Sequence, residues 1–222
     1  MIKWLVNSII KLISHTILKI DTSEIKTFPK EGPLLAVANH VNFLDAPVII
    51  SHLHPRPTTG LVKKESWDIP LYAFLFNVWG GIPIDRNIMD FSAFQKAKQA
   101  LNEGKILAVS PEGTRSETGE MLRAKSGISI LARQVDVPII PMAYWGHEDL
   151  SENLKRLKRT PMYIRVGRKF RIDFSQLPKN KESMQAAADA IMMEIARLLP
   201  EKYRGVYSAG AFEREKFVQY LE

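Results

Sequence analysis

Residues 1–20 place apolar side chains at the spacing of one broad helical face. At about 100° per residue, the apolar positions fall within a single arc that only Thr16 interrupts. Lysines and other polar residues fill the opposite side together with Trp4 and Leu18, and the stretch contains no acid. The arc consists of Ile2, Leu5, Val6, Ile9, Ile10, Leu12, Ile13, Ile17 and Ile20. This pattern predicts a basic amphipathic helix.

Such a helix fits the surface of an anionic membrane, with Trp4, Leu5, Ile9 and Ile13 in contact with lipid. A helix that packs its apolar face on its own domain would show the same pattern. Polar groups recur too often for a transmembrane span, and no uninterrupted apolar region or small-residue cleavage site indicates a signal peptide. We expect a membrane-surface helix over residues 1–24 and a folded domain over residues 25–222.

Beyond this helix, short apolar runs alternate with longer helical patterns. The expected strands are 34–38, 58–64, 82–84, 105–109 and 137–144, and the expected helices are 47–53, 69–79, 87–102, 126–134 and 181–199. Segments 162–165 and 169–173 have the pattern of a hairpin. Alternating elements with apolar strands predict a layered α/β domain. Its central sheet would be mixed, mostly buried and flanked by helices.

Composition narrows the chemistry. A chain of 222 residues is long enough for one domain with a substantial core. The absence of cysteine excludes disulfides, a cysteine nucleophile and thiolate metal sites. A formal net charge of +7 favours anionic partners: nucleic acid, acidic lipid or a phosphorylated substrate. The sequence has no nucleic-acid recognition motif and no set of metal ligands, so lipid and phosphorylated substrates remain.

A histidine and an aspartate follow the expected strand 34–38. A neutral imidazole such as that of His40 can take a proton from a hydroxyl that attacks a carbonyl. A carboxylate such as that of Asp45 can bond the other ring nitrogen and fix the tautomer. On a straight helix these positions would lie about 140° apart, so the chain must turn between them. The expected strand-to-helix loop supplies that turn, although the spacing alone is common by chance.

Two further loops carry arginines beside glycines. Arg86 follows the short expected strand 82–84, where its guanidinium could reach an anion, or could instead pair with Asp85 at the surface. The loop 110–116 follows strand 105–109. There, Gly113 permits close backbone approach and Arg115 can bind phosphate. Glu112 could orient the arginines or hold the loop, and the loop could also be a plain polar turn.

These pieces, in this order, resemble the 1-acylglycerol-3-phosphate acyltransferases, which are lysophospholipid acyltransferases. His40, four residues and Asp45 resemble the first block of that family, its HX4D motif. Residues 81–86 resemble the second block, 111–116 the third, and the proline-bracketed apolar run 137–141 the fourth. The resemblance covers about residues 30–145. Four ordered blocks in strand-and-loop contexts are far harder to reach by chance than one.

The resemblance implies direct acyl transfer without an acyl-enzyme intermediate. His40 would be the general base and Asp45 its orienting carboxylate, with backbone N–H groups near Gly113 stabilising the oxyanion. The acceptor phosphate would contact Arg86, Glu112, Gly113, Thr114 and Arg115, with Lys63, Lys64 and Lys125 as further candidates.

The implied reaction moves a fatty acyl group from acyl-CoA or acyl-carrier protein to 1-acylglycerol 3-phosphate, giving phosphatidate for phospholipid synthesis. No cofactor or metal is needed. The expected place is the cytoplasmic face of a membrane, as a peripheral protein. Other acceptors stay open, namely glycerol 3-phosphate, a different lysophospholipid or an aminolipid. A non-catalytic lipid-binding module is a further alternative, which the intact His40 and Asp45 disfavour.

Overall fold

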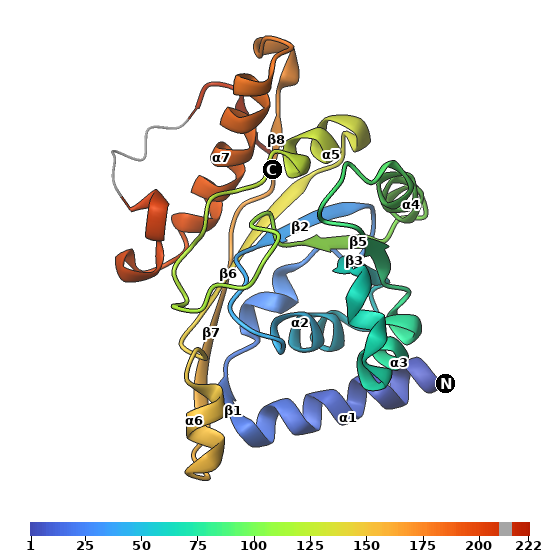
Figure 1. Cartoon of the computed structure of the whole chain (residues 1–222), viewed down its shortest axis with the longest axis vertical. Helices are drawn as coiled ribbons and strands as arrows, with labels where there is room; N and C mark the ends of the chain where they lie inside the picture. Colours follow the sequence, from blue (N-terminus) through green and yellow to red (C-terminus); the bar gives the residue numbers. More distant parts are fainter. Residues whose placement is uncertain (209–214) are drawn as a thin grey trace.

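A computed structural model describes residues 1–208 and 215–222. Within these residues, nine strands form one mixed sheet (Figure 1). The strands are β1 (Leu18–Ile20), β2 (Leu34–Ala38), β3 (Thr58–Lys63), β4 (Ile82–Ile84), β5 (Ile106–Val109), β6 (Ile139–Trp145), β7 (Thr160–Val166), β8 (Phe170–Ile172) and β9 (Val218–Tyr220). Their order is β1-β7-β6-β2-β5-β3-β4, with β8 paired to β6 and β9 to β8. The predicted mixed α/β sheet is confirmed.

Helices cover both faces of this sheet. They are α1 (Ile2–Ile17), α2 (Asp45–Leu53), α3 (Pro70–Trp79), α4 (Phe91–Asn102), α5 (Gly127–Val135), α6 (Leu150–Lys155) and α7 (Lys181–Ala196). The central strand β2 is buried along its whole length because alternate side chains enter two apolar layers. Leu35 and Val37 pack in the layer that contains α4, α5 and α7. Leu34 and Ala36 pack in the layer that contains α2 and β1.

The first helix is shorter than the sequence pattern predicts. It ends at Ile17, and the next three residues form β1, which runs parallel to β7. Leu18 is fully buried there. Arg159 caps the helix end by donating hydrogen bonds to the carbonyl oxygens of His15 and Leu18. Strand pairing at the sheet edge thus replaces the last helical turn, which local periodicity alone does not reveal.

The inward face of α1 also differs from the prediction. Val6, Asn7 and Ser14 are its buried residues, so two polar positions point toward the domain. The Asn7 Oδ1 accepts a hydrogen bond of 2.9 Å from the indole Nε1 of Trp79 at the end of α3. A buried amide and a buried indole thereby satisfy each other, and most of the apolar arc remains outside.

The predicted hairpin of residues 162–165 and 169–173 is wrong. Both β7 and β8 pair antiparallel to the same strand, β6, one after the other. Met142 lies opposite Val166, and Ile139 lies opposite Phe170. The intervening residues 167–169 interrupt the ladder without reversing the chain. Sequence patterning could not distinguish an interrupted strand from two strands joined by a turn.

The loop that carries Arg86 is held by the start of α4. Asp90 caps that helix, with its Oδ1 accepting from the backbone N–H of Ala93 at 3.0 Å. Its second oxygen accepts from the backbone N–H of Asp85 at 3.0 Å. One side chain therefore begins α4 at Phe91, later than the predicted residue 87, and fixes the preceding loop.

Candidate active site

The sequence blocks meet at one edge of the sheet. Strands β2, β5, β3 and β4 are parallel neighbours, and β2 is also parallel to β6. Their carboxyl ends therefore lie on the same side, where open α/β sheets usually bind ligands. The loops after β2, β4, β5 and β6 carry His40, Arg86, Glu112 and His147 respectively. The fold gathers these side chains from positions up to about a hundred residues apart.

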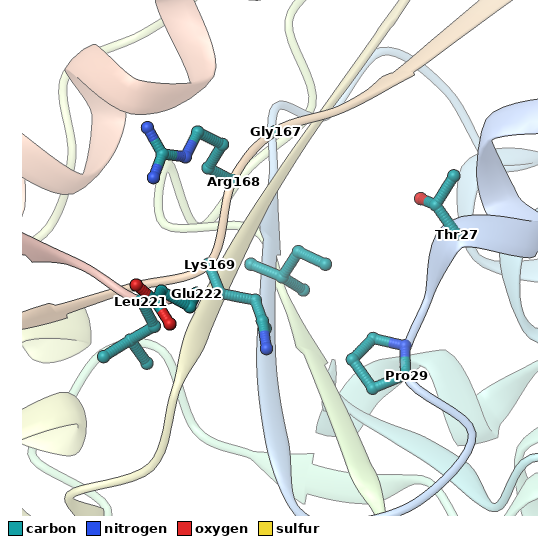
Figure 2. A pocket seen from close by; sticks show the side chains of 8 residues that line it. Thr27, Pro29, Gly167, Arg168, Lys169, Leu221 and Glu222 are labelled. Atoms are coloured by element: carbon teal, nitrogen blue, oxygen red, sulfur yellow. The ribbon is translucent and has the colours of Figure 1, made fainter.

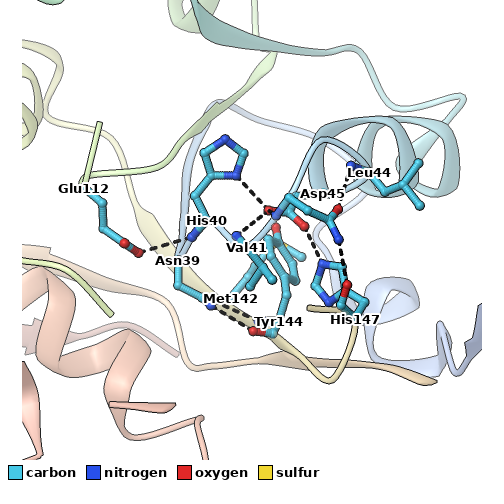
Figure 3. A network of polar contacts seen from close by, with 10 residues as sticks. Asn39, His40, Val41, Leu44, Asp45, Glu112, Met142, Tyr144 and His147 are labelled. Carbon is cyan, nitrogen blue, oxygen red and sulfur yellow. Dashed lines mark hydrogen bonds and ion pairs between the residues drawn. The ribbon is translucent and has the colours of Figure 1, made fainter. Parts of the chain in front are cut away.

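His40 and Asp45 form a direct hydrogen bond. The distance from His40 Nδ1 to Asp45 Oδ2 is 2.7 Å (Figure 3). The same oxygen accepts from the backbone N–H groups of Val41 and Asn42 at 2.8 and 3.1 Å. Asn42 Oδ1 in turn accepts from the N–H of Leu44. This tight turn between β2 and α2 brings the two side chains together, as the sequence requires for a catalytic pair.

The pairing with Asp45 determines which ring nitrogen of His40 carries the proton. Burial alone would raise the pKa of Asp45, but hydrogen bonds from His147 and His40 outweigh it and lower that pKa from 3.8 to about 2. An ionised carboxylate only accepts hydrogen bonds, so His40 donates from Nδ1. The neutral ring then carries its lone pair on Nε2, which points away from Asp45 (Figure 3). Because the His40 side chain is 17% exposed, a substrate hydroxyl can approach it.

A second histidine, which the sequence did not reveal, contacts the other oxygen of Asp45. The distance from His147 Nε2 to Asp45 Oδ1 is 2.6 Å, and the His147 side chain is completely buried. His147 lies two residues beyond the end of β6. The available signal was its place just after an expected strand, at the edge where the other blocks end.

Amide side chains fasten this part of the sheet edge. Asn39 exchanges two hydrogen bonds with the backbone of Tyr144, donating to its carbonyl at 2.8 Å and accepting from its N–H at 2.9 Å. Asn42 donates to the carbonyl oxygen of His147 at 2.8 Å. Both contacts join the loop after β2 to β6 and the residues that follow it. The positions of His40 and His147 are therefore coupled through the backbone as well as through Asp45.

Glu112 is buried beside His40. Its Oε1 accepts from the backbone N–H of His40, and its Oε2 accepts from the N–H of Leu122, each at 3.1 Å. Burial raises its pKa from 4.5 to about 8. These contacts are those of a residue that holds the loop, which was one of the two roles considered from sequence. Its predicted contribution to phosphate binding stays a prediction.

Arg86 and Arg115 form a cationic pair without bound carboxylates. Burial and the neighbouring charge of Arg115 lower the pKa of Arg86, while Glu65 raises it. Asp85 pairs with Lys64 at 2.6 Å and not with Arg86. In the described part of the chain, no salt bridge engages Arg86 or Arg115. Two close guanidinium groups without such partners form a suitable site for an anion.

The loop 110–116 reaches His40 directly. The backbone N–H of Ser116, next to Arg115, donates to the carbonyl oxygen of His40 at 2.9 Å. Thr114 and Arg115 are exposed on this loop. The loop therefore places the predicted phosphate-binding positions beside the catalytic pair.

Gly113 shapes this loop through its backbone. It has a φ of 70°, which favours glycine. A side chain there would meet the stem of Lys125 at 3.0 Å, so Lys125 lies against the loop. The Gly113 N–H donates to the carbonyl of Ser110 at 3.0 Å. That N–H group is therefore occupied within the turn, and the expectation that backbone N–H groups near Gly113 stabilise an oxyanion stays a prediction.

The lysines proposed as further phosphate contacts differ in their surroundings. Lys64 is held by Asp85 at 2.6 Å, and Lys63 lies 3.8 Å from Glu65. Lys125 contacts Gly113 and is exposed. Of the three, Lys125 is thus the one that reaches the loop beside His40. The sequence could not separate Lys64 from the others because its carboxylate partner Asp85 lies beyond α3 and β4.

A hollow elsewhere in the molecule is separate from this network. A cavity of about 410 Å³ lies beside the loop between β7 and β8 and the chain end (Figure 2). Its lining residues are Thr27, Pro29, Ile140, Gly167, Arg168, Lys169, Leu221 and Glu222. Apart from Ile140, it contains no residue of the four blocks. Volume alone therefore does not locate the chemistry, whereas the polar network does.

The residues expected to contact the membrane lie on the outer surface of α1. Trp4, Leu5, Ile9 and Ile13 are each about half exposed or more. Across residues 1–208 and 215–222, no helix combines the length and apolar character that crossing a bilayer demands. The same residues include no cluster of three side chains suited to hold a metal ion.

We predict that Glu112 makes stability depend on pH in the neutral range. Its pKa is raised from 4.5 to about 8 in the folded protein, so the neutral form favours folding. The contribution of Glu112 to the free energy of unfolding should be largest below about pH 4.5 and should fall, by up to about 1.4 kcal/mol per pH unit, until about pH 8. Glu112→Gln should flatten this dependence in urea unfolding measured across that range. Glu120→Gln, at an exposed position of the same loop, is the control; identical slopes in all three proteins would contradict the prediction.

Comparison with known proteins places these features in a family. A family model described as "Acyltransferase" matches residues 19–145. A 1-acyl-sn-glycerol-3-phosphate acyltransferase of Chlamydomonas reinhardtii is 28% identical over 180 residues, which are 80% of this chain and 52% of that protein. An enzyme of the same name from Cocos nucifera is 28% identical over 178 residues, 78% of this chain and 56% of that protein. The chain thus spans about half the length of these two relatives.

A bacterial relative matches over most of its own length. The 1-acyl-sn-glycerol-3-phosphate acyltransferase of Bacillus subtilis is 25% identical over 174 residues, 78% of this chain and 84% of that protein. The fold resembles the crystal structure of the 1-acyl-sn-glycerophosphate (LPA) acyltransferase PlsC from Thermotoga maritima. That match has a TM-score of 0.65 and 21% identity, over 87% of this chain and 76% of the other. Since the family model spans more than half of the sequence and includes the loops of His40, Arg86 and Arg115, the chain belongs to the acyltransferase family.

Proposed function

We propose that this protein transfers a fatty acyl group from a thioester to the free hydroxyl of 1-acylglycerol 3-phosphate, giving phosphatidate. The observation that carries the proposal is the bond of 2.7 Å between His40 and an ionised, buried Asp45, in a site that also presents Arg86 and Arg115. Family membership and the names of the relatives agree with this reaction. The donor is acyl-CoA or acyl-carrier protein.

In the proposed mechanism, His40 acts as the general base. Its Nε2 takes the proton from the acceptor hydroxyl while that oxygen bonds to the thioester carbonyl carbon. The carbonyl oxygen becomes an oxyanion, and collapse of the tetrahedral intermediate breaks the carbon–sulfur bond. The leaving thiolate or solvent then takes the proton from the His40 imidazolium, which Asp45 stabilises in the meantime. No covalent enzyme intermediate is needed.

The acceptor's phosphate would bind at Arg86 and Arg115. Burial and, after it, the charge of Arg115 lower the pKa of Arg86, and a dianionic phosphate between the two arginines would relieve their mutual repulsion. Lys125 lies against the same loop and would add positive charge. This arrangement selects a phosphorylated acceptor, but it serves glycerol 3-phosphate as well as its 1-acyl derivative.

The protein would bind the cytoplasmic face of a membrane through α1. Leu5, Ile9 and Ile13 share one exposed apolar face, and Trp4 is exposed on the same helix among lysines that suit anionic head groups. Helix α3 lies beside the first turns of α1 and adds exposed Leu71 and Phe74 (Figure 1). Such a surface exceeds what isolated exposed apolar residues would give and supports insertion into the lipid interface.

Removal of the general base should nearly abolish turnover. We expect His40→Ala to lower kcat about 10³-fold, within the range typical of general base catalysis, and Asp45→Asn to lower it about 10²-fold or more. The assay supplies purified enzyme with lysophosphatidate vesicles and either acyl-CoA or acyl-carrier protein as donor. His52→Ala is the control because His52 contacts His15 and Val48, outside the network. Near-normal turnover of both His40→Ala and Asp45→Asn would refute the catalytic assignment.

Loss of either arginine should weaken acceptor binding. Arg86→Gln and Arg115→Gln should each raise the KM for lysophosphatidate about tenfold or more, with a smaller effect on kcat. They should also reduce the preference for lysophosphatidate over monoacylglycerol, which lacks the phosphate. Arg123→Gln is a matched control, since Arg123 is exposed in the same connection and faces Asp189. An unchanged KM in both site variants would show that the phosphate binds elsewhere, and parallel assays with glycerol 3-phosphate would identify the preferred acceptor.

The exposed face of α1 should control membrane binding. The triple variant Leu5→Gln, Ile9→Gln, Ile13→Gln removes apolar area that is already outside the core, so it should fold normally. Its partitioning onto vesicles with anionic lipid should fall about tenfold or more in a sedimentation assay. The control triple variant Leu154→Gln, Leu157→Gln, Val206→Gln changes equally exposed apolar residues elsewhere. Equal sedimentation of both triple variants would count against α1 as the docking element.

A further inference from the structure

Asp45 is shared by two imidazoles. His40 bonds one carboxylate oxygen at 2.7 Å and His147 bonds the other at 2.6 Å. His40 is partly exposed, whereas His147 is completely buried. The two histidines come from different loops, after β2 and after β6, and approach the carboxylate from opposite sides (Figure 3). Of the two, the partially exposed ring can meet a substrate and the buried one cannot.

The hydrogen bonds define the state of the buried ring. Because the Asp45 carboxylate is ionised, His147 must donate to it from Nε2. His147 Nδ1 is buried and has no hydrogen-bond partner among the described residues. A proton on Nδ1 would therefore be a buried donor without an acceptor, which costs more than an unshared lone pair. The geometry thus favours the His147 tautomer that carries its proton on Nε2.

The backbone around His147 aims its ring at Asp45. Gly146 has a φ of 90°, and a side chain there would meet the ring of Tyr163 at 2.9 Å. Its N–H donates to Glu148 Oε1 at 3.1 Å. On the other side, Asn42 donates to the carbonyl oxygen of His147 at 2.8 Å. The chain thus turns sharply after β6, and the turn is tied to the same loop that holds His40.

We propose that His147 is a positioning residue for acyl transfer, which holds the Asp45 carboxylate so that its Oδ2 faces His40 Nδ1 and keeps the His40 lone pair on Nε2. The proposal rests on the proposed function. His147 does not touch substrate and moves no proton. Without its N–H, Asp45 Oδ1 would be a buried charged acceptor with no side-chain donor. The backbone N–H groups of Val41 and Asn42 would still hold Oδ2, but the carboxylate would be held on one oxygen only and would take up a proton more readily.

Substitutions at this position separate a donated hydrogen bond from mere filling of space. His147→Leu has a similar volume but no donor, so kcat should fall about 10- to 100-fold, with the KM of both substrates within about twofold of wild type. His147→Gln can place its amide N–H near the position of the imidazole Nε2–H and should restore most of that loss. Leu150→Ala is the control for a loosened segment, because Leu150 is buried nearby and contacts none of these groups through hydrogen bonds. If His147→Leu and His147→Gln lose activity equally, or if neither loses activity, the proposal is overturned.

A double-substitution cycle tests whether His147 acts through Asp45. In the Asp45→Asn background, His147→Leu should change kcat by less than about twofold, because the carboxylate that it orients is gone. If His147 contributed only to the structure, the loss of kcat in the double variant would be the product of the losses in the two single variants. Full multiplication would overturn the proposal.

Nitrogen NMR of the imidazoles decides the question without any assay of turnover. In the wild type, His40 should carry its proton on Nδ1 and His147 on Nε2, each proton strongly deshielded by its short bond to Asp45. In His147→Leu, the His40 signals should show a mixture of tautomers, and His147→Gln should return them to the wild-type state. If the His40 tautomer is unchanged in folded His147→Leu, the positioning role is overturned. This test holds even if none of the acceptors tried supports turnover. An inactive wild type with the expected NMR result would instead discredit the proposed reaction alone.

Discussion

The loops after β2 and β6 both form hydrogen bonds with the carboxylate of Asp45. This carboxylate is buried at the start of α2, accepts bonds from two backbone N–H groups, and is bonded on each oxygen by a histidine. An isolated charge in that position would be strongly disfavoured, since burial penalises the ionised form. The donors around it reverse this preference, and the pKa of Asp45 falls to about 2. The negative charge that orients His40 therefore persists in the interior because the loops after β2 and β6 both supply donors.

This constraint explains why the sheet order matters for the site. β2 lies between β5 and β6, so the loops after these three strands emerge side by side. Asn39 fixes the end of β2 to Tyr144 of β6, and Glu112 fixes the loop after β5 to the N–H of His40. Two polar side chains thus set the distance between the imidazole and the cationic loop. A shift of either neighbouring strand would separate groups that must act together.

Local patterns sufficed for much of the architecture. The apolar runs that became β2, β5 and β6 are short and largely buried, and each ends at a polar residue or a glycine, so their pattern is informative. The turn between His40 and Asp45 also follows from sequence, because no straight helix could join them. Long-range features were beyond reach. His147 lies 102 residues from Asp45, and only the pairing of β2 with β6 brings them together.

Charge placement was harder to predict than secondary structure. Glu112 stands in a glycine turn among charged residues, which usually indicates solvent exposure, yet its side chain is buried and accepts hydrogen bonds from the backbone N–H groups of His40 and Leu122. In α1, Asn7 looked like part of a polar surface, but Trp79 from α3 bonds it inside the protein. In both cases a distant segment provides the partner, and the sequence of the segment itself carries no sign of that partner.

The attachment of α1 has a consequence for how the molecule would work at a bilayer. The helix is joined to the sheet by β1, to α3 by the Asn7–Trp79 bond and at its end by Arg159, and it packs along α2, which begins with Asp45. These contacts hold α1 in a fixed position on the domain. If α1 binds lipid as proposed, the contacts that hold α1 to the domain would set how deeply the protein enters the bilayer. They would also set how far the His40 ring lies above the acyl chains. The acceptor hydroxyl would then have to move a fixed distance out of the bilayer to reach His40, and the fold would determine that distance.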